Sequence, residues 1–136
     1  MILRKPTFED MYKTLFLFSE DEEERKQILS EWINQSNNNP QFFSWVIVKE
    51  KDVVAAVTGW YNMESGIGHI GRIEGKELLK QKLFNKILKE FDPEKVTISL
   101  EKLDNFADQF KVDSYNLSWI KTIEDIEIEN ISGEEN

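Results

Sequence analysis

Hydrophobic residues alternate with polar ones, or run together in short stretches, in the segments of the chain that predict β-strands. Phe43–Val48 and Val53–Thr58 are rich in aromatic and β-branched residues, and the polar turn between them predicts a β-hairpin. Gly59–Tyr61 would either extend the second of these strands or form a bulge in it. Three weaker patterns predict the remaining strands: Met1–Arg4, Val96–Leu100 and Ile120–Ile131.

A period of three to four residues, typical of amphipathic helices, occupies segments between these strands. Thr7 and Asp10 have nearly the spacing of a capping box and predict the start of a first helix. Its apolar stripe consists of Phe8, Met11, Tyr12, Leu15 and Phe16. A second helix starts at Ser19, with acidic residues in its first turns, and ends before the polar loop Asn34–Pro40.

The longest helical pattern begins at Gly75 and ends at Phe91, before an Asp-Pro pair. Its apolar face repeats every four residues, and most of its lysines fall on the solvent side. The repeating positions are Leu79, Leu83, Ile87 and Phe91. A shorter helix is predicted at Leu103–Phe110.

The order of the elements is therefore β-α-α-β-β-(β)-α-β-α-β. The strand–helix–strand succession in the second half implies one parallel pair, and the hairpin implies antiparallel neighbours, so we expect a mixed sheet. A length of 136 residues is typical of one domain. We place that domain at residues 1–131 and expect a flexible acidic tail at residues 132–136.

The charge balance narrows the classes of partner. The chain has 26 acidic and 17 basic residues, for a formal net charge of −9. This excess of acid argues against binding to nucleic acid and to an anionic membrane surface. Solubility is one explanation for it, and an acidic face that docks a basic protein partner is the other. The chain has no cysteine, no signal-peptide pattern and no apolar stretch of membrane-spanning length, so we expect a cytoplasmic protein.

Three segments within residues 1–77 resemble the GNAT superfamily of acyl-CoA-dependent N-acetyltransferases. They are the opening Ile2–Asp10, the hairpin Trp45–Val57, and Arg72–Glu77 at the start of the long helix. The family motif at the third segment is Gln/Arg-x-x-Gly-x-Gly/Ala; Arg72 and Gly75 match it, whereas Glu77 does not. The resemblance implies an α/β (α+β) fold in which a mixed, mostly antiparallel sheet is flanked by helices on both faces.

The same resemblance implies a site for acetyl-CoA at the third segment. Its residues would be Arg72, Ile73, Gly75, Lys76 and Glu77. Backbone N–H groups at a helix N-terminus can bind phosphate, but a glutamate in the first turn opposes the anion by its bulk and charge. Lys76 would partly offset this repulsion. The alternative is that this segment is an ordinary helix start with an acid in its first turn.

The catalytic roles of the family would fall on the segment Met63–Gly71 and on residues near it. A backbone N–H of this segment would polarise the thioester, and Glu64 would take the proton of the acceptor amine. Asp104–Phe110 resembles the family helix that precedes a catalytic tyrosine, but Lys111 stands in the tyrosine position. Lys111, Tyr115 or Tyr61 would then protonate the leaving thiolate.

His69, the single histidine, lies in the glycine-rich segment beside the expected cofactor turn. It is either a general base or a partly exposed loop histidine, and we expect no metal site because no second histidine or cysteine is present. Trp60 and Tyr61 are the aromatic residues most suited to line a cleft.

Three functions remain open. The first is transfer of an acetyl group from acetyl-CoA to an amine of a small molecule or protein. The second is a catalytically inactive GNAT-like acidic protein that binds a macromolecular partner, such as a basic protein. The third is binding of CoA or another small ligand without turnover. In each case a second copy of the chain is a further candidate partner, as a homodimer.

Overall fold

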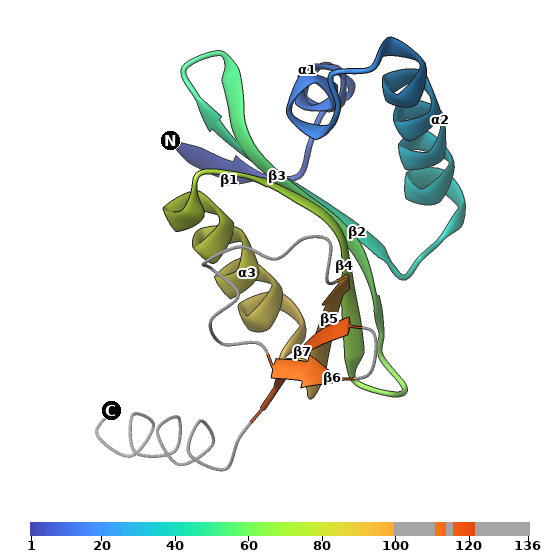
Figure 1. Ribbon diagram of the computed structural model, residues 1–136, viewed down its shortest axis with the longest axis vertical. Helices are drawn as coiled ribbons and strands as arrows, with labels where there is room; N and C mark the ends of the chain where they lie inside the picture. The colour runs from blue at the N-terminus through green and yellow to red at the C-terminus, as the bar shows by residue number, and fades with distance from the viewer. Residues whose placement is uncertain (100–110, 114–115, 122–136) are drawn as a thin grey trace.

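The computed structural model describes residues 1–99, 111–113 and 116–121, which form seven strands and three helices (Figure 1). In chain order the elements are β1 (Ile2–Arg4), α1 (Phe8–Phe18), α2 (Glu22–Asn38), β2 (Phe42–Lys49), β3 (Asp52–Asn62), β4 (Ile67–Gly75), α3 (Glu77–Phe91), β5 (Lys95–Ser99), β6 (Lys111–Asp113) and β7 (Asn116–Ile120). All of these strands belong to one sheet, in the order β1-β2-β3-β4-β5-β7-β6. Among the described residues, no helix is long and apolar enough to cross a membrane.

The sheet is mixed and mostly antiparallel, as predicted. β4 and β5 run parallel, and the other neighbouring strands of the described sheet run antiparallel. The predicted hairpin is formed by β2 and β3, and the predicted parallel pair by β4 and β5, which α3 connects. The expected first strand is also confirmed, as β1 at one edge of the sheet.

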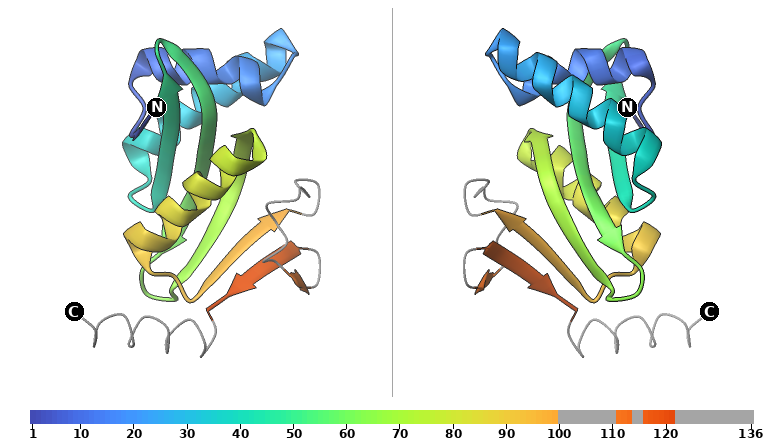
Figure 2. Two further views of the ribbon diagram at one scale, coloured as in Figure 1. Left: turned by 90° about the vertical axis from the view of Figure 1, so that its left-hand side faces the viewer. Right: turned by 90° about the vertical axis from the view of Figure 1, so that its right-hand side faces the viewer.

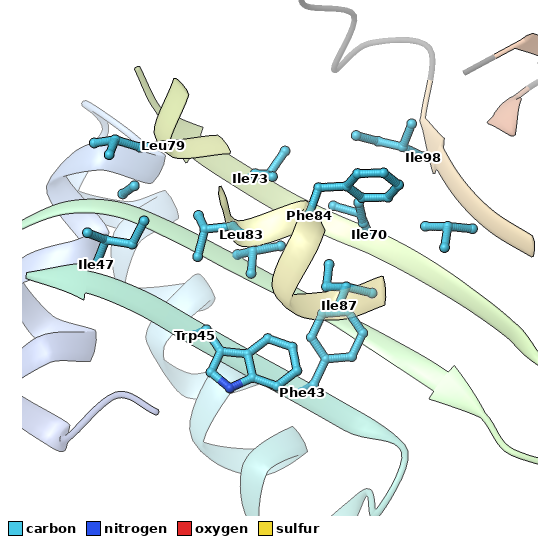
Figure 3. Packing of buried hydrophobic residues seen from close by; sticks show 13 residues of the cluster. Phe43, Trp45, Ile47, Ile70, Ile73, Leu79, Leu83, Phe84, Ile87 and Ile98 are labelled. Atoms are coloured by element: carbon cyan, nitrogen blue, oxygen red, sulfur yellow. The ribbon is translucent and has the colours of Figure 1, made fainter. Parts of the chain in front are cut away.

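Helices cover both faces of the sheet, with α1 and α2 on one side and α3 on the other (Figures 1 and 2). The larger core lies under α3, where the predicted helix face is confirmed (Figure 3). Leu83 and Ile87 are completely buried there, and Leu79 is 9% exposed. They pack against apolar residues of the sheet, including Trp45, Ile70 and Ile98.

The predicted core face of α1 is wrong in part. Leu15 is buried, but Phe8, Tyr12 and Phe16 are more than half exposed, at 64%, 54% and 58%. The helix instead turns Asp10 and Thr14 inward, toward the sheet. The cause is an ion pair that joins the helix to β1, because Arg4 donates two hydrogen bonds to the Asp10 carboxylate, at 2.9 and 3.1 Å.

Asp10 also completes the predicted capping box of α1. The Thr7 hydroxyl accepts a hydrogen bond from the Asp10 N–H, and the Asp10 carboxylate accepts one from the Thr7 N–H. Burial by itself would raise the pKa of Asp10, but the hydrogen bonds from Arg4 and Thr7 outweigh it. The pKa therefore lies below its ordinary value of 3.8. The carboxylate is charged in the folded protein and holds β1 and α1 together.

We expect Asp10→Ala to destabilise the fold by about 1–3 kcal/mol, because Arg4 loses its partner and the helix loses half of its capping box. Since folding lowers the Asp10 pKa, the carboxylate stabilises the protein above the unfolded value of 3.8, and this contribution is lost as the pH falls through the folded pKa. Denaturant melts at neutral pH and at about pH 3 should therefore give a smaller difference between variant and parent at the acidic pH. An equal difference at both would contradict this role. Glu9→Ala, which removes an exposed carboxylate from the same turn, is the control.

Two further boundaries differ from the predictions. α2 begins after Asp21, whose side chain accepts a hydrogen bond from the Glu23 N–H, rather than at Ser19. It also continues through Asn38, into the stretch predicted as a loop, because side-chain amides four residues apart bond along the helix. It ends at Asn39, the residue before a proline.

Several expectations fall on residues outside the described ranges. They are the helix Leu103–Phe110, most of the strand Ile120–Ile131, the residue Tyr115 and the tail at residues 132–136. β7, which ends at Ile120, was not predicted.

Candidate active site

A cleft of about 820 Å³ lies between α2 and the face of the sheet that α1 and α2 cover. The end of α1 closes one side of it, and β3 and β4 form its floor. Residues that contribute to its lining include Phe18, Glu24, Glu31, Trp32, Trp60 and His69. The cleft is therefore walled by aromatic rings and carboxylates, with an imidazole on the floor.

A β-bulge shapes the floor where β3 meets β4. Gly59 pairs with Ile70 and Thr58 pairs with Arg72, so Gly71 has no partner of its own in β3. Gly59 packs against the His69 carbonyl so closely that a Cβ at this position would collide with its oxygen. Of the two expectations for Gly59–Tyr61, the extension is confirmed, because β3 continues to Asn62, whereas the extra residue of the bulge lies opposite, in β4.

Next to the bulge, β4 and β5 separate. Their pairing runs from Ile67↔Lys95 to Ile70↔Ile98, and among the described residues it goes no further. β4 itself continues to Gly75, paired with β3 only, and Figure 2 shows β5 turning away from it. The edge of β4 from Gly71 onward therefore carries backbone groups that no described strand pairs with.

His69 lies in β4, one residue before the last pair that β4 forms with β5. It is therefore not the loop histidine that was one of the two alternatives. It is half-buried, its ring packs on Trp60 with centroids 4.7 Å apart, and its Nδ1 lies 2.6 Å from Thr97 Oγ1. Burial lowers the pKa of His69 below its ordinary value of 6.5. The imidazole is therefore neutral at neutral pH and can accept a proton.

The two aromatic residues proposed for a cleft point to opposite faces of the sheet, as neighbours in a strand do. Trp60 lines the cleft and is 45% exposed. Tyr61 instead stacks on Phe91 of α3, with ring centroids 4.6 Å apart, and lines a second cleft of about 400 Å³. Only Trp60 is therefore available to the cleft.

No protein-family model matches the chain, and no curated protein matches it in sequence. Solved structures do match it. A mutant of the spermidine N-acetyltransferase SpeG from Vibrio cholerae has a TM-score of 0.67 at 10% identity, over 88% of this chain and 95% of that one. Aminoglycoside 6'-acetyltransferase type Ii has a TM-score of 0.65 at 15% identity, over 90% of this chain and 97% of that one. The chain has the GNAT fold.

A third GNAT structure was solved with the cofactor that the resemblance implies. The N-acetyltransferase PseH from Campylobacter jejuni, in complex with acetyl coenzyme A, has a TM-score of 0.61 at 7% identity. It covers 89% of this chain, and the whole of that chain is matched. At identities this low the likeness establishes the GNAT fold, and the site has to be judged on the residues of this chain.

The five residues expected to bind the cofactor do not all lie in a turn. Arg72, Ile73 and Gly75 belong to β4, and only Lys76 and Glu77 lie at the start of α3. The Ile73 side chain is buried in the core under α3. Arg72 lines the cleft on the opposite face, with its guanidinium 5.9 Å from the centre of the Phe18 ring.

Gly75 has a structural reason to be glycine. Its φ of +130° is rarely adopted by other residues, and a Cβ there would lie 2.6 Å from the Cβ of Ala55. A bulkier side chain at Gly75 would therefore disturb the packing of β4 against β3.

The start of α3 nevertheless fits a phosphate group. Lys76 occupies the N-cap without a side-chain hydrogen bond to the helix, and its own cationic side chain is exposed. Glu77 is exposed too, so its carboxylate can turn to solvent, away from the N–H groups of the first turn. Together with the free edge of β4, these residues fit an extended ligand that ends in phosphates.

Of the catalytic residues expected from the resemblance, the structure describes the side chain of Glu64 and the backbone of Lys111. Glu64 is exposed in the turn between β3 and β4 and is not among the residues that line the cleft. Lys111 lies in β6, where it pairs with Ser118. Tyr115 lies outside the described residues.

Three residues of the site had no signal in the sequence analysis. Glu24 and Glu31 belong to α2, which was given no site residue, and Thr97 belongs to the short strand β5. A helical wheel of α2 could have found the first two, since they share a face with Ile28 and Trp32. Thr97 depends on the register between β4 and β5.

Proposed function

We propose that the chain is an N-acetyltransferase that moves an acetyl group from acetyl-CoA to an amine. The observation that carries this proposal is the position of His69, a histidine with a lowered pKa in an open cleft, beside the point where β4 and β5 separate. The names of the GNAT neighbours support an amine acceptor, since they include a spermidine and an aminoglycoside acetyltransferase.

The chain's own residues would hold the cofactor along β4 and α3. The free edge from Gly71 to Gly75 offers backbone N–H and C=O groups to an extended amide arm. The first turn of α3, with the Lys76 ammonium beside it, offers N–H groups to phosphates. When bound, acetyl-CoA supplies the acetyl group as an activated thioester.

His69 would act as the general base. An amine reaches the cleft mainly as an ammonium ion and must lose a proton before its nitrogen can attack. The Thr97 hydroxyl lies 3.5 Å from the Gly68 carbonyl, to which it donates, so its oxygen is left to accept from Nδ1–H of His69. This tautomer keeps Nε2 free to take the proton.

The acid that protonates the leaving thiolate remains a proposal carried over from the resemblance. Tyr115 is our first candidate and Lys111 the second. Because His69 lines the cleft and Glu64 does not, His69 replaces Glu64 as the proposed base.

Acetyl-CoA binding tests the proposal directly. We expect Glu77→Ala to tighten the binding about two- to fivefold, because it removes a like charge from the helix N-terminus that would hold the phosphates. Titration calorimetry of the parent and the variant measures this change.

Glu64→Ala is the matched control, since it removes an equally exposed carboxylate from the other end of β4 and should leave the affinity unchanged. If neither the parent nor Glu77→Ala binds acetyl-CoA at millimolar concentration, the transferase proposal fails. A loss of turnover in Glu64→Ala would restore Glu64 as the base.

One observation favours the second candidate function, binding of a protein partner. Phe8, Tyr12 and Phe16 form an exposed aromatic stripe along α1. A partner held there, including a second copy of the chain, should be released by Tyr12→Glu. Sedimentation of the parent and the variant distinguishes a monomer from a homodimer.

A further inference from the structure

We propose that the acceptor is a dication: a primary amine joined by a flexible methylene chain to a second cationic group. The reacting amine lies at His69 and the second cation at Glu31. This inference deepens the proposed function and rests on it, since it names the class of substrate that the same cleft takes.

The size of the cleft and the spacing of its carboxylates carry the first part of the argument. A volume of about 820 Å³ exceeds what a simple alkylamine fills, so a longer ligand is needed to occupy it. Glu24 and Glu31 are seven residues apart on α2, which places them two helical turns, or about 10 Å, from each other on one wall. The wall formed by α2 therefore presents two separate carboxylates to the cleft that His69 also lines.

The two carboxylates are not equivalent. The Ser19 hydroxyl donates a hydrogen bond to Glu24, at 3.0 Å. Arg72 also lies at this end of the cleft, over the ring of Phe18, and its positive charge repels a cation there. Glu31 has no ion pair or hydrogen bond from another side chain in the described part of the chain, and it stands next to Trp32. The second cation is therefore expected at Glu31.

The aromatic walls suit the rest of such a ligand. Trp60 offers an exposed ring face beside His69, and Phe18 and Phe42 contribute further rings to the lining. Rings of this kind attract ammonium groups through their electron-rich faces and also pack against methylene groups. His69 is neutral, because burial lowers its pKa, and so adds no repelling charge at the reacting end.

The negative net charge of the chain also favours a doubly charged cation as the acceptor. At −9 the molecule attracts cations over long range, and twice as strongly when they carry two charges. Among the described residues that line the cleft, Arg72 is the one fixed positive charge, against the carboxylates of Glu24 and Glu31. A zwitterion or an anionic acceptor would place a negative group near Glu31, where it would be repelled.

The test compares three probes of similar length: cadaverine, a diamine; pentylamine, the corresponding monoamine; and aminohexanoate, in which a carboxylate replaces the second amine. Titration calorimetry measures their binding to the parent, to Glu31→Gln and to Glu22→Gln. Glu22 is an exposed carboxylate of α2 outside the cleft lining and serves as the matched control. Acetyl transfer from acetyl-CoA to each probe is measured in parallel.

We expect cadaverine to bind about tenfold more tightly than pentylamine, and Glu31→Gln to remove most of this difference while leaving pentylamine unchanged. Glu22→Gln should have no effect, and kcat/KM should follow the same order. Equal binding of the diamine and the monoamine, tighter binding of aminohexanoate, or a preference that survives in Glu31→Gln would overturn the inference. If the Glu31-dependent preference is found without acetyl transfer, the inference about the ligand stands and the proposed function fails. If acetyl is transferred to all three probes at equal rates, the proposed function stands and the inference about a second cation fails.

Discussion

Replacing His69 with glutamine should lower kcat for acetyl transfer by about 10²- to 10⁴-fold, which is the usual contribution of a general base. Glutamine keeps a polar group near Thr97 and Trp60 but cannot take up a proton at neutral pH. The acceptor and acetyl-CoA should still bind, so KM for both should change little. Steady-state kinetics on parent and variant measure this split between kcat and KM.

The pH dependence of the reaction separates a base from a residue that only fills space. Burial lowers the pKa of His69, so the imidazole is neutral at neutral pH and becomes protonated only below its ordinary value of 6.5. The kcat/KM of the parent should therefore fall on the acidic side of that value, and this acidic limb should be missing in His69→Gln. Glu24 and Glu31 line the same cleft, and the limb would remain in His69→Gln if either of them acted as the base.

Thr97→Val tests the contact between His69 and Thr97 that orients the proposed base. Valine has nearly the shape of threonine but cannot accept the Nδ1–H of His69, so the tautomer is no longer fixed. We expect kcat to fall by about tenfold, with Thr97→Ser restoring most of it. Unfolding midpoints of all three variants near that of the parent would show that the fold is intact. Unchanged kinetics in His69→Gln would mean that the cleft is not where the chemistry occurs.

How far the sequence predicts this fold depends on how local each pattern is. The face of α3 is correct because four apolar residues at regular spacing leave one orientation for the helix. The face of α1 is partly wrong because its orientation is decided by the pair between Arg4 and Asp10, which joins two elements. Phe8, Tyr12 and Phe16 were predicted as core residues because their spacing alone gives no sign of the ion pair between Arg4 and Asp10.

The site is less predictable than the fold, because its residues are distant in the sequence and meet only through the register in which two strands pair. His69 and Thr97 are 28 residues apart and meet only because β4 and β5 pair in one particular register. The motif at Arg72–Glu77 was expected to form a cofactor turn, yet its first four residues belong to a strand, and Gly75 is required by its contact with Ala55. A glycine that matches a motif can thus have a packing reason that the sequence does not reveal.

The buried face of α3 gives the largest expected effect on stability. Leu83 is completely buried between the helix and the sheet, together with Phe84 and Ile87 (Figure 3). Leu83→Ala should lower the free energy of unfolding by about 2–5 kcal/mol, because it removes buried apolar surface and leaves a cavity that the rigid sheet cannot fill.

Lys82→Ala is the control for this change, since Lys82 is the preceding residue on the same helix but faces solvent. It should change the free energy of unfolding by no more than about 0.5 kcal/mol. Denaturant melts of both variants give the comparison, and equal losses would contradict the assigned face of α3.

The packing of α3 matters for the site as well, because α3 connects β4 to β5 and holds both strands in the register that joins His69 to Thr97. We therefore expect Leu83→Ala to lose acetyl transfer on warming before the parent does, whereas Lys82→Ala should follow the parent.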